Sequence, residues 1–305
     1  MALLIGLAVP ASAQTAPLAF ILDADTANEM DDMYAITQAL LDQRAAPIAL
    51  SSAHFNNVEI FVRKRWHHYD MAGFVTVEAS QRENERLLGL LGSTIPAPMG
   101  ARDIIGFSWG YFDGAPIPQA PAIDFIIARA RTASPEHKLA VVMLGPLTNV
   151  AAALIKAPDI APRIHVYALG AKYDVASGVW DKNEFNIRND LNAADYMLNR
   201  DDVALTILPA TVAAGLKFDR TDTLARLARS PRAVAPVLAG RWDFVDAGAS
   251  WTMWDLALTL AVTHPELATF ETRAAPPENR RRTLEVITAI DAPGMRQAFW
   301  SVFGA

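Results

Sequence analysis

The segment from Leu18 to Leu41, LAFILDADTANEMDDMYAITQALL, constrains the fold more than any other part of the chain. It begins with an unbroken apolar run, Leu18 to Leu22, which is typical of a β-strand buried on both faces of a parallel sheet. Four aspartates follow this run closely, and beyond them apolar residues recur at helical spacing. We therefore expect a strand, an acidic loop and a helix in direct succession.

The rest of the chain continues the alternation of strands and helices. Alternation of this kind predicts an α/β fold, with a mostly parallel open sheet that carries helices on both faces. No repeat, low-complexity tract or linker interrupts residues 18–305, so we predict one domain there. Strands are expected at 18–22, 47–50, 139–144, 164–169, 203–208 and 284–290, and helices at 58–71, 83–91, 123–131, 147–155, 191–199 and 254–262.

The four aspartates Asp23, Asp25, Asp31 and Asp32 are expected at the carboxyl end of the first strand. Ligands bind at this edge of open α/β sheets. Because carboxylates so close together repel one another, a bound cation is the usual way to hold them, and oxygen donors favour Ca²⁺ or Mg²⁺ over zinc. A structural reading is also open, in which Asp31 caps the helix and the helix dipole favours Asp32.

The composition excludes several classes of function. The chain has no cysteine, which excludes disulfides, thiolate catalysis and Cys-ligated zinc. Its net charge of -6 and the absence of a basic stripe argue against nucleic-acid binding. No apolar stretch reaches the roughly 20 residues that a membrane-spanning helix needs, so no membrane segment is expected.

The N-terminal residues 1–13 are predicted to form a signal peptide. An apolar segment is followed by Ala11-Ser12-Ala13, an A-x-A site before Gln14, although no Lys or Arg precedes the apolar run. We expect a periplasmic or secreted protein. The alternative is a cytoplasmic protein with an ordinary apolar N-terminus.

Three sequence strings are specific in combination. The acidic loop Asp23–Asp32 is similar to the pattern D-x-D-x-G-x-D-D, but it has two additional residues and lacks the glycine. The second string is Gly145 to Asn149, which reads Gly-Pro-Leu-Thr-Asn. Asn183 to Asn186 match the core of an N-x-E-F-N segment, and Trp254-Asp255 opens a helix where His-Asp would complete the pattern. In these strings the chain resembles the calcium-dependent nucleoside hydrolases of the inosine–uridine-preferring type.

The resemblance implies hydrolysis of the N-glycosidic bond of ribonucleosides to ribose and free base. By the same resemblance Asp31 would be the general base that takes a proton from a calcium-bound water, and Asp23 would brace the cluster. The implied Ca²⁺ ligands are the carboxylates of Asp25, Asp32 and Asp255 and the main-chain carbonyl of Thr148. The implied substrate-binding residues are Asn57, Asn183, Glu184 and Asn186.

The departures from the family pattern concern residues around the substrate. The two extra loop residues, Asn28 and Glu29, would reach either the metal or the sugar. Trp254 replaces the histidine associated with leaving-group protonation, and Trp109 stands where many members have histidine, so a purine would stack on either tryptophan. The expected partner is a small ribonucleoside, and a homo-oligomer is left open.

Two other functions remain open from the residues. Phe20 to Thr26 resembles the D-x-D-x-T strand end of haloacid-dehalogenase-type phosphatases, in which Asp23 would be the nucleophile and Mg²⁺ the metal. An exported nucleoside- or sugar-binding protein without turnover is the other, and the replacement at Trp254 favours it. Asp31 argues against pure binding, because a binding protein needs no general base.

The predicted signal peptide leads to an expected mass. Protein isolated from its natural host should begin after Ala13, because Ala11-Ser12-Ala13 fits cleavage by signal peptidase. Intact-mass spectrometry of the native protein checks this. A mass that includes Met1, or lacks only Met1, would contradict the prediction and favour the cytoplasm.

Overall fold

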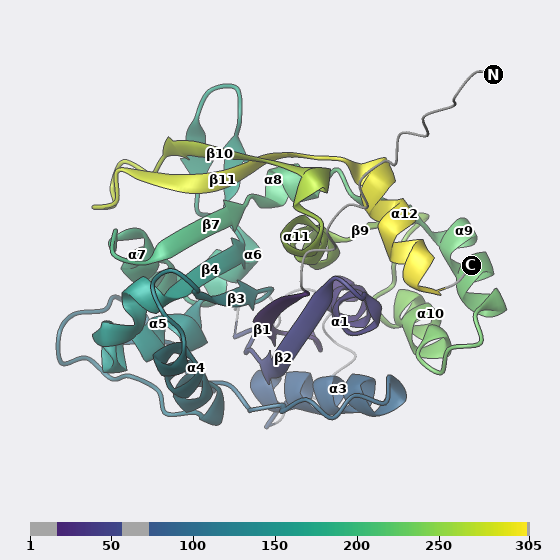
Figure 1. Ribbon diagram of the computed structural model, residues 1–305, viewed down its shortest axis with the longest axis horizontal. Coiled ribbons are helices and arrows are strands. Elements are labelled where there is room, and N and C mark those ends of the chain that lie inside the picture. The colour runs from purple at the N-terminus through teal and green to yellow at the C-terminus, as the bar shows by residue number, and fades with distance from the viewer. Residues whose placement is uncertain (1–16, 57–72, 304–305) are drawn as a thin grey trace, which may run out of the picture.

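The computed structural model describes residues 17–56 and 73–303, and these form an α/β domain around one large sheet (Figure 1). The sheet has seven strands in the order β10-β11-β7-β4-β3-β1-β2. All neighbours pair in parallel except β10 and β11, which are antiparallel. The strands are β1 Leu18–Ala24, β2 Ala45–Ser52, β3 Leu139–Met143, β4 Ile164–Leu169, β7 Ala204–Leu208, β10 Ala268–Ala274 and β11 Thr283–Ile290.

Helices cover both faces of this sheet, so the predicted fold class is confirmed. One apolar core contains residues of α1, α3, α10, α11 and α12, and the other contains residues of α4, α5 and α7. The helices are α1 Asp31–Leu41, α3 Thr76–Leu90, α4 Pro121–Thr132, α5 Thr148–Lys156, α6 Phe185–Asn189, α7 Leu191–Leu198, α8 Ala210–Ala213, α9 Arg220–Arg229, α10 Ala235–Phe244, α11 Trp254–Thr263 and α12 Ala292–Phe303.

Short elements complete the chain. Within the described residues, two small two-stranded antiparallel sheets lie outside the main sheet, and two 3₁₀ turns connect helices to strands. Their bounds are β5 Lys172–Asp174 with β6 Val179–Asp181, β8 Lys217–Asp219 with β9 Ser250–Thr252, and the turns Pro158–Arg163 and Pro265–Leu267. Among the described residues, no helix has the length and apolar character required to cross a membrane.

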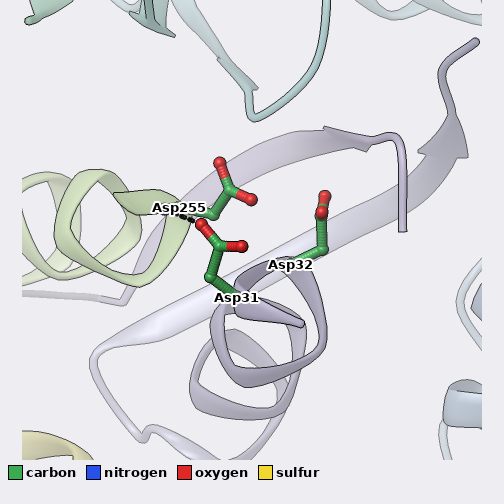
Figure 2. A group of neighbouring side chains, drawn as sticks. All are labelled: Asp31, Asp32 and Asp255. Atoms are coloured by element: carbon green, nitrogen blue, oxygen red, sulfur yellow. Dashed lines mark hydrogen bonds between the residues drawn. The ribbon is translucent and has the colours of Figure 1, made fainter. Parts of the chain in front are cut away.

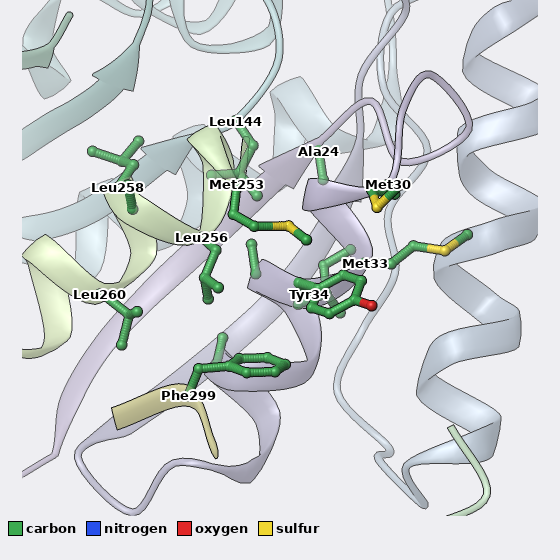
Figure 3. Close-up of a cluster of buried hydrophobic side chains, with 14 of the residues drawn as sticks. Ala24, Met30, Met33, Tyr34, Leu144, Met253, Leu256, Leu258, Leu260 and Phe299 are labelled. Atoms are coloured by element: carbon green, nitrogen blue, oxygen red, sulfur yellow. The ribbon is translucent and has the colours of Figure 1, made fainter. Parts of the chain in front are cut away.

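The core beside β1 fixes the helices that carry the acidic residues. Tyr34 of α1 is fully buried, and its ring lies 5.3 Å from that of Phe299 on α12. Trp242 of α10 donates a 2.9 Å hydrogen bond from its indole nitrogen to the Tyr34 hydroxyl. Figure 3 shows Met253 and Leu256 of the α11 region packed over the same helix. The starts of α1 and α11 are therefore held side by side by apolar packing.

Most predicted elements are found, with shifted ends. The strand at 164–169 has the predicted bounds, whereas the helix predicted at 83–91 begins earlier, at Thr76. The prediction misses β10 and α12, and the helix predicted at 58–71 lies outside the described residues. The predicted signal peptide, residues 1–13, also lies outside them.

Candidate active site

Three carboxylates converge where α1 and α11 begin (Figure 2). Asp31 and Asp32 are the first residues of α1, and Asp255 lies in the first turn of α11. Their ligating oxygen atoms all lie within 4.8 Å of one another, and each residue is buried. Because both helix N-termini carry partial positive charge, they favour carboxylates at these positions. This is the group of potential metal ligands found in the described part of the chain.

One hydrogen bond ties the two helix starts together. The main-chain N–H of Asp255 donates to Oδ2 of Asp31 at 3.1 Å, across 224 residues of sequence. This N–H is one of the donors that a helix N-terminus leaves without an intrahelical partner. Asp31 therefore has a structural contact as well as a place in the site, and the contact fixes the orientation of its carboxylate.

Burial and mutual repulsion raise the pKa values of the clustered carboxyls. The pKa of Asp31 and that of Asp32 each rise to about 7, chiefly because both groups are buried. The pKa values of Asp25 and Asp255 are raised well above the ordinary value by burial and then by neighbouring carboxylates. Removing negative charges from water without a counter-charge is costly, so this cluster favours a bound cation.

The donor set fits a hard divalent cation. One oxygen of Asp32 and one of Asp255 are buried with no hydrogen-bond partner among the described residues. Such orphaned carboxylate oxygens are the ligands that Ca²⁺ and Mg²⁺ take in proteins. Asp25 lies beside the trio, and its carboxyl interacts electrostatically with Asp31, Asp32 and Asp255.

Two of the three carboxylates open onto a cavity of about 260 Å³ at the carboxyl ends of the strands. Asp31 and Asp255 line it, together with Asp25 and the two extra loop residues, Asn28 and Glu29. The Asn28 side-chain amide donates to Asp25 at 3.3 Å, while its own side-chain carbonyl oxygen is buried and has no hydrogen-bond partner in the described ranges 17–56 and 73–303. The remaining lining residues are Leu144, Leu169, Lys172, Asn183, Glu184, Phe185, Asn186, Ala210 and Trp254.

The predicted substrate-binding residues line this cavity but also make internal hydrogen bonds. Glu184 caps α6 by accepting from the main-chain N–H groups of Asn186 and Ile187, each at 3.1 Å. Burial raises the pKa of Glu184. The side-chain amide of Asn186 donates to the main-chain carbonyl of Leu144 at 2.5 Å, and the side-chain Oδ1 of Asn183 accepts from the Arg188 guanidinium at 3.1 Å. Asn57 lies outside the described residues.

The two tryptophans are placed very differently. Trp254 lines the cavity directly before Asp255, with the Trp251 ring 6.5 Å away in an edge-on arrangement. Trp109 is 73% exposed and does not line the cavity, and its ring centroid lies 5.0 Å from that of Phe107 and 5.6 Å from that of Phe112 in a stacked cluster. Of these two tryptophans, Trp254 is the one that offers an aromatic surface to the cavity, which Phe185 also lines.

Thr148 begins α5 and belongs to a buried polar chain that the sequence did not predict. Its hydroxyl donates to Asp190 at 2.8 Å and lies 2.9 Å from Nε2 of His54. Because the hydroxyl proton goes to Asp190, we assign the proton of His54 to Nε2. Burial lowers the pKa of His54 to about 4 and raises that of Asp190 to about 6. Asp190 gave only a weak signal, as an aspartate before a helix.

Asp23 lies behind the site. It is fully buried at the end of β1, and its carboxylate accepts hydrogen bonds from the Ser51 hydroxyl and, at 2.8 Å, from the Asn149 amide. Burial raises its pKa to about 7. Asp23 does not line the cavity, so an incoming phosphate ester would not reach it there. This placement disfavours the phosphatase reading.

The sequence also failed to single out Arg241 of α10. Its guanidinium donates to the main-chain carbonyls of Glu29 at 2.9 Å and Ala27 at 2.7 Å. Its charge lowers the pKa of Asp32, which partly offsets the effect of burial. An arginine in a helix of mixed composition carries no signal that links it to a loop 212 residues away.

Comparison with known proteins identifies the class. A plant nucleoside hydrolase shares the fold with a TM-score of 0.69 at 18% identity, over 95% of this chain and 99% of that one. A purine-preferring ribonucleoside hydrolase from Gardnerella vaginalis gives 0.66 at 21% identity, over 94% and 98%. The parallel sheet with a carboxylate cluster at its strand ends therefore defines an α/β protein of the nucleoside hydrolase architecture.

The chain belongs to the inosine-uridine preferring nucleoside hydrolase family, whose model matches residues 20–297. This confirms the predicted family and places the chain among hydrolases that act on N-glycosyl compounds. An uncharacterised protein of Schizosaccharomyces pombe is 29% identical over 189 residues, 55% of this chain. That match spans 59% of the length of the yeast protein.

The raised carboxyl pKa values predict how the metal-free protein responds to pH. The pKa values of Asp31 and Asp32 are about 7 in the folded protein, against 3.8 for an ordinary aspartate. As the pH rises, these groups therefore lose their protons at a lower pH in the unfolded chain than in the folded protein. The stability that depends on their uncharged forms is fully present below the unfolded value and is lost as the pH rises through about 7. The melting temperature of chelator-treated protein should therefore fall between about pH 5 and about pH 8.

Two controls sharpen this test. Asp31→Asn should flatten the slope, because the amide does not titrate, and a saturating divalent cation should remove it by stabilising the charged forms. His54 acts in the opposite sense, since its pKa is lowered to about 4, but it is one group against several carboxyls. A melting temperature of the chelated protein that rises across this pH range would contradict the prediction.

Proposed function

We propose that the protein hydrolyses the N-glycosidic bond of ribonucleosides and releases ribose and free base. One observation carries the proposal: the buried carboxylates of Asp31 and Asp255 line the same cavity as the polar residues Asn183, Glu184 and Asn186. Membership of the nucleoside hydrolase family supports it. An assay of free ribose released from a panel of ribonucleosides tests it, and no release from any of them would refute it.

The carboxylates suit the charge that develops in this reaction. Cleavage of an N-glycosidic bond gives the sugar oxocarbenium character, which negative groups fixed at the cavity wall stabilise. Asp31 is the proposed general base, because it faces the cavity and its carboxylate can accept a proton from an attacking water. The hydrogen bond from Asp255 to Oδ2 holds this carboxylate in one orientation and leaves its other oxygen for the proton.

We propose Ca²⁺ as the cation, held by the carboxylates of Asp25, Asp32 and Asp255 and by the main-chain carbonyl of Thr148. When bound, a divalent cation would polarise the attacking water and offset the charge of the cluster. The sugar would be oriented by Asn183, Glu184 and Asn186. Trp254 contributes an aromatic wall on which a base would stack, in place of a proton donor to the leaving group.

The alternative hypothesis of a binding protein is based on Trp254, and a measurement of turnover distinguishes it from the hydrolase. A pure nucleoside receptor would bind ribosides and release no ribose, whereas the hydrolase releases ribose with each turnover. Activity against a general phosphate ester tests the phosphatase reading in the same experiment. The proposed compartment is the periplasm or the exterior, with Ala11-Ser12-Ala13 as its support.

Asp31→Asn should abolish most turnover while leaving substrate binding in place. The amide keeps the shape of the side chain but removes the base, so kcat should fall by about 10²–10⁴. KM should change little, because Asn183, Glu184 and Asn186 remain. Steady-state kinetics with a cleavable riboside measures both constants.

Asp23→Asn is the matched variant for this experiment. Substitution of a residue that supports metal ligands without facing the substrate typically lowers activity by about 10–100-fold. Asp23→Asn should therefore lower turnover less than Asp31→Asn. Riboside turnover that survives Asp31→Asn would remove Asp31 as the base. Phosphatase activity lost only in Asp23→Asn would overturn the hydrolase function.

Asp255→Ala should weaken calcium binding severely. The substitution removes a proposed ligand carboxylate. The affinity for Ca²⁺ should therefore fall by more than the loss of about 10–100-fold that is typical when a residue supporting a ligand is substituted. Titration calorimetry of metal-free protein with Ca²⁺ measures this, and the rise in melting temperature on adding calcium should shrink in parallel. The exposed Asp113→Ala serves as control. Equal calcium affinity in Asp255→Ala and wild type would refute the proposed ligand set.

A further inference from the structure

Arg241 is a buried cation that the proposed reaction leaves without a role. The side chain is 6% exposed, and its guanidinium lies over the ring of Phe244, 4.1 Å from the centroid. Burying a charge is unfavourable unless polar groups compensate it. Among the described residues, the guanidinium donates to two main-chain carbonyls of the acidic loop, those of Ala27 and Glu29.

These two carbonyls lie on either side of Asn28, the first of the two additional loop residues. Upstream, the Thr26 hydroxyl is held by Asn84 of α3, and downstream Asp31 is already part of α1. Between them, the main-chain N–H of Asn28 donates to the Asp25 carbonyl at 2.8 Å. Residues 25–28 thus form a tight turn, and Arg241 satisfies the main-chain carbonyl of Ala27 inside this turn and that of Glu29 directly after it.

The turn determines what the loop presents to the cavity. Asn28 and Glu29 both line the cavity, and the carbonyl oxygen of the Asn28 side chain is buried with no hydrogen-bond partner in the part of the chain that the structure describes. A planar guanidinium donates in two fixed directions, so it sets the position of two carbonyls at once, which a flexible ammonium does not. The loop conformation therefore depends on a residue of a helix far away in sequence.

We propose that Arg241 is the positioning residue of this active site: it locks residues 27–29 in the conformation that places Asn28 and Glu29 at the cavity and keeps Asp25 beside the acidic trio. The inference rests on the proposed function for its catalytic consequence only. Its structural part holds for the metal-free protein as well.

Hydrogen exchange of the metal-free protein tests the structural part. In Arg241→Met, which keeps much of the buried volume but donates nothing, peptides covering residues 25–32 should exchange faster by about tenfold or more. Arg232→Met is the matched control, because Arg232 also donates to a carbonyl, that of Val302, and stacks on Phe303, away from the loop. It should leave exchange in 25–32 unchanged.

Two further readouts separate positioning from general stability. Affinity for Ca²⁺, measured by calorimetry, should fall by about 10–100-fold in Arg241→Met and stay unchanged in Arg232→Met, as for supporting residues of metal sites. If wild type cleaves ribosides, kcat should fall with the affinity. If it cleaves none, the proposed function fails, yet exchange and calcium affinity still decide the role of Arg241.

Arg241→Lys decides between the two hydrogen bonds and the charge alone. Lysine keeps the charge but lacks the planar pair of donors, so exchange in 25–32 should remain faster than in wild type. This variant also serves if Arg241→Met does not fold. Wild-type exchange and calcium affinity in Arg241→Lys would overturn the proposal, as would equal behaviour of Arg241→Met and Arg232→Met.

Discussion

The repulsion among buried carboxylates is the constraint on which the site depends. Asp31, Asp32 and Asp255 bring their oxygen atoms within 4.8 Å of one another with almost no contact with water. Such a cluster is unfavourable unless its negative charge is compensated. Two helix N-termini and the nearby guanidinium of Arg241 supply part of the compensation, and a cation bound to the carboxylate oxygens would supply the rest. Burial of the two large apolar cores stabilises the folded state and offsets the unfavourable free energy of the carboxylate cluster.

The apolar packing around Tyr34 explains why the cluster is held together in spite of its charge. Tyr34 contacts Phe218, Phe299 and Trp242, which belong to three different elements, so α1 is fixed by several neighbours at once. Figure 3 shows Phe299 beside Tyr34. α11 packs on the same face of the sheet, and its first turn carries Asp255. The distance between the two helix starts is set by these side chains and not by the carboxylates themselves.

Several residues of the cavity have two tasks. Glu184 caps a short helix and faces the cavity, Asn186 ties two strand ends together, and Asp31 satisfies a helix N–H while facing the substrate space. A polar group that is already hydrogen-bonded on one side keeps a single orientation, so substrate and water meet a preorganised surface. The same property means that substitutions of these residues will change local structure as well as chemistry.

The sequence by itself determined the alternation of buried strands and helices, the acidic loop after β1 and, through three short strings, the family. These features are local, because apolar periodicity and motif spacing act over a few residues. Only the tertiary structure brought Asp255 to Asp31, placed Trp254 at the cavity and Trp109 outside it, and joined Arg241 to the loop. The helix α12 escaped prediction because it opens with Ala-Pro-Gly, which reads as a turn although proline is tolerated in a first helical turn. Contacts across more than two hundred residues are decided by which faces of the helices pack on the sheet, and this information is spread over the whole core.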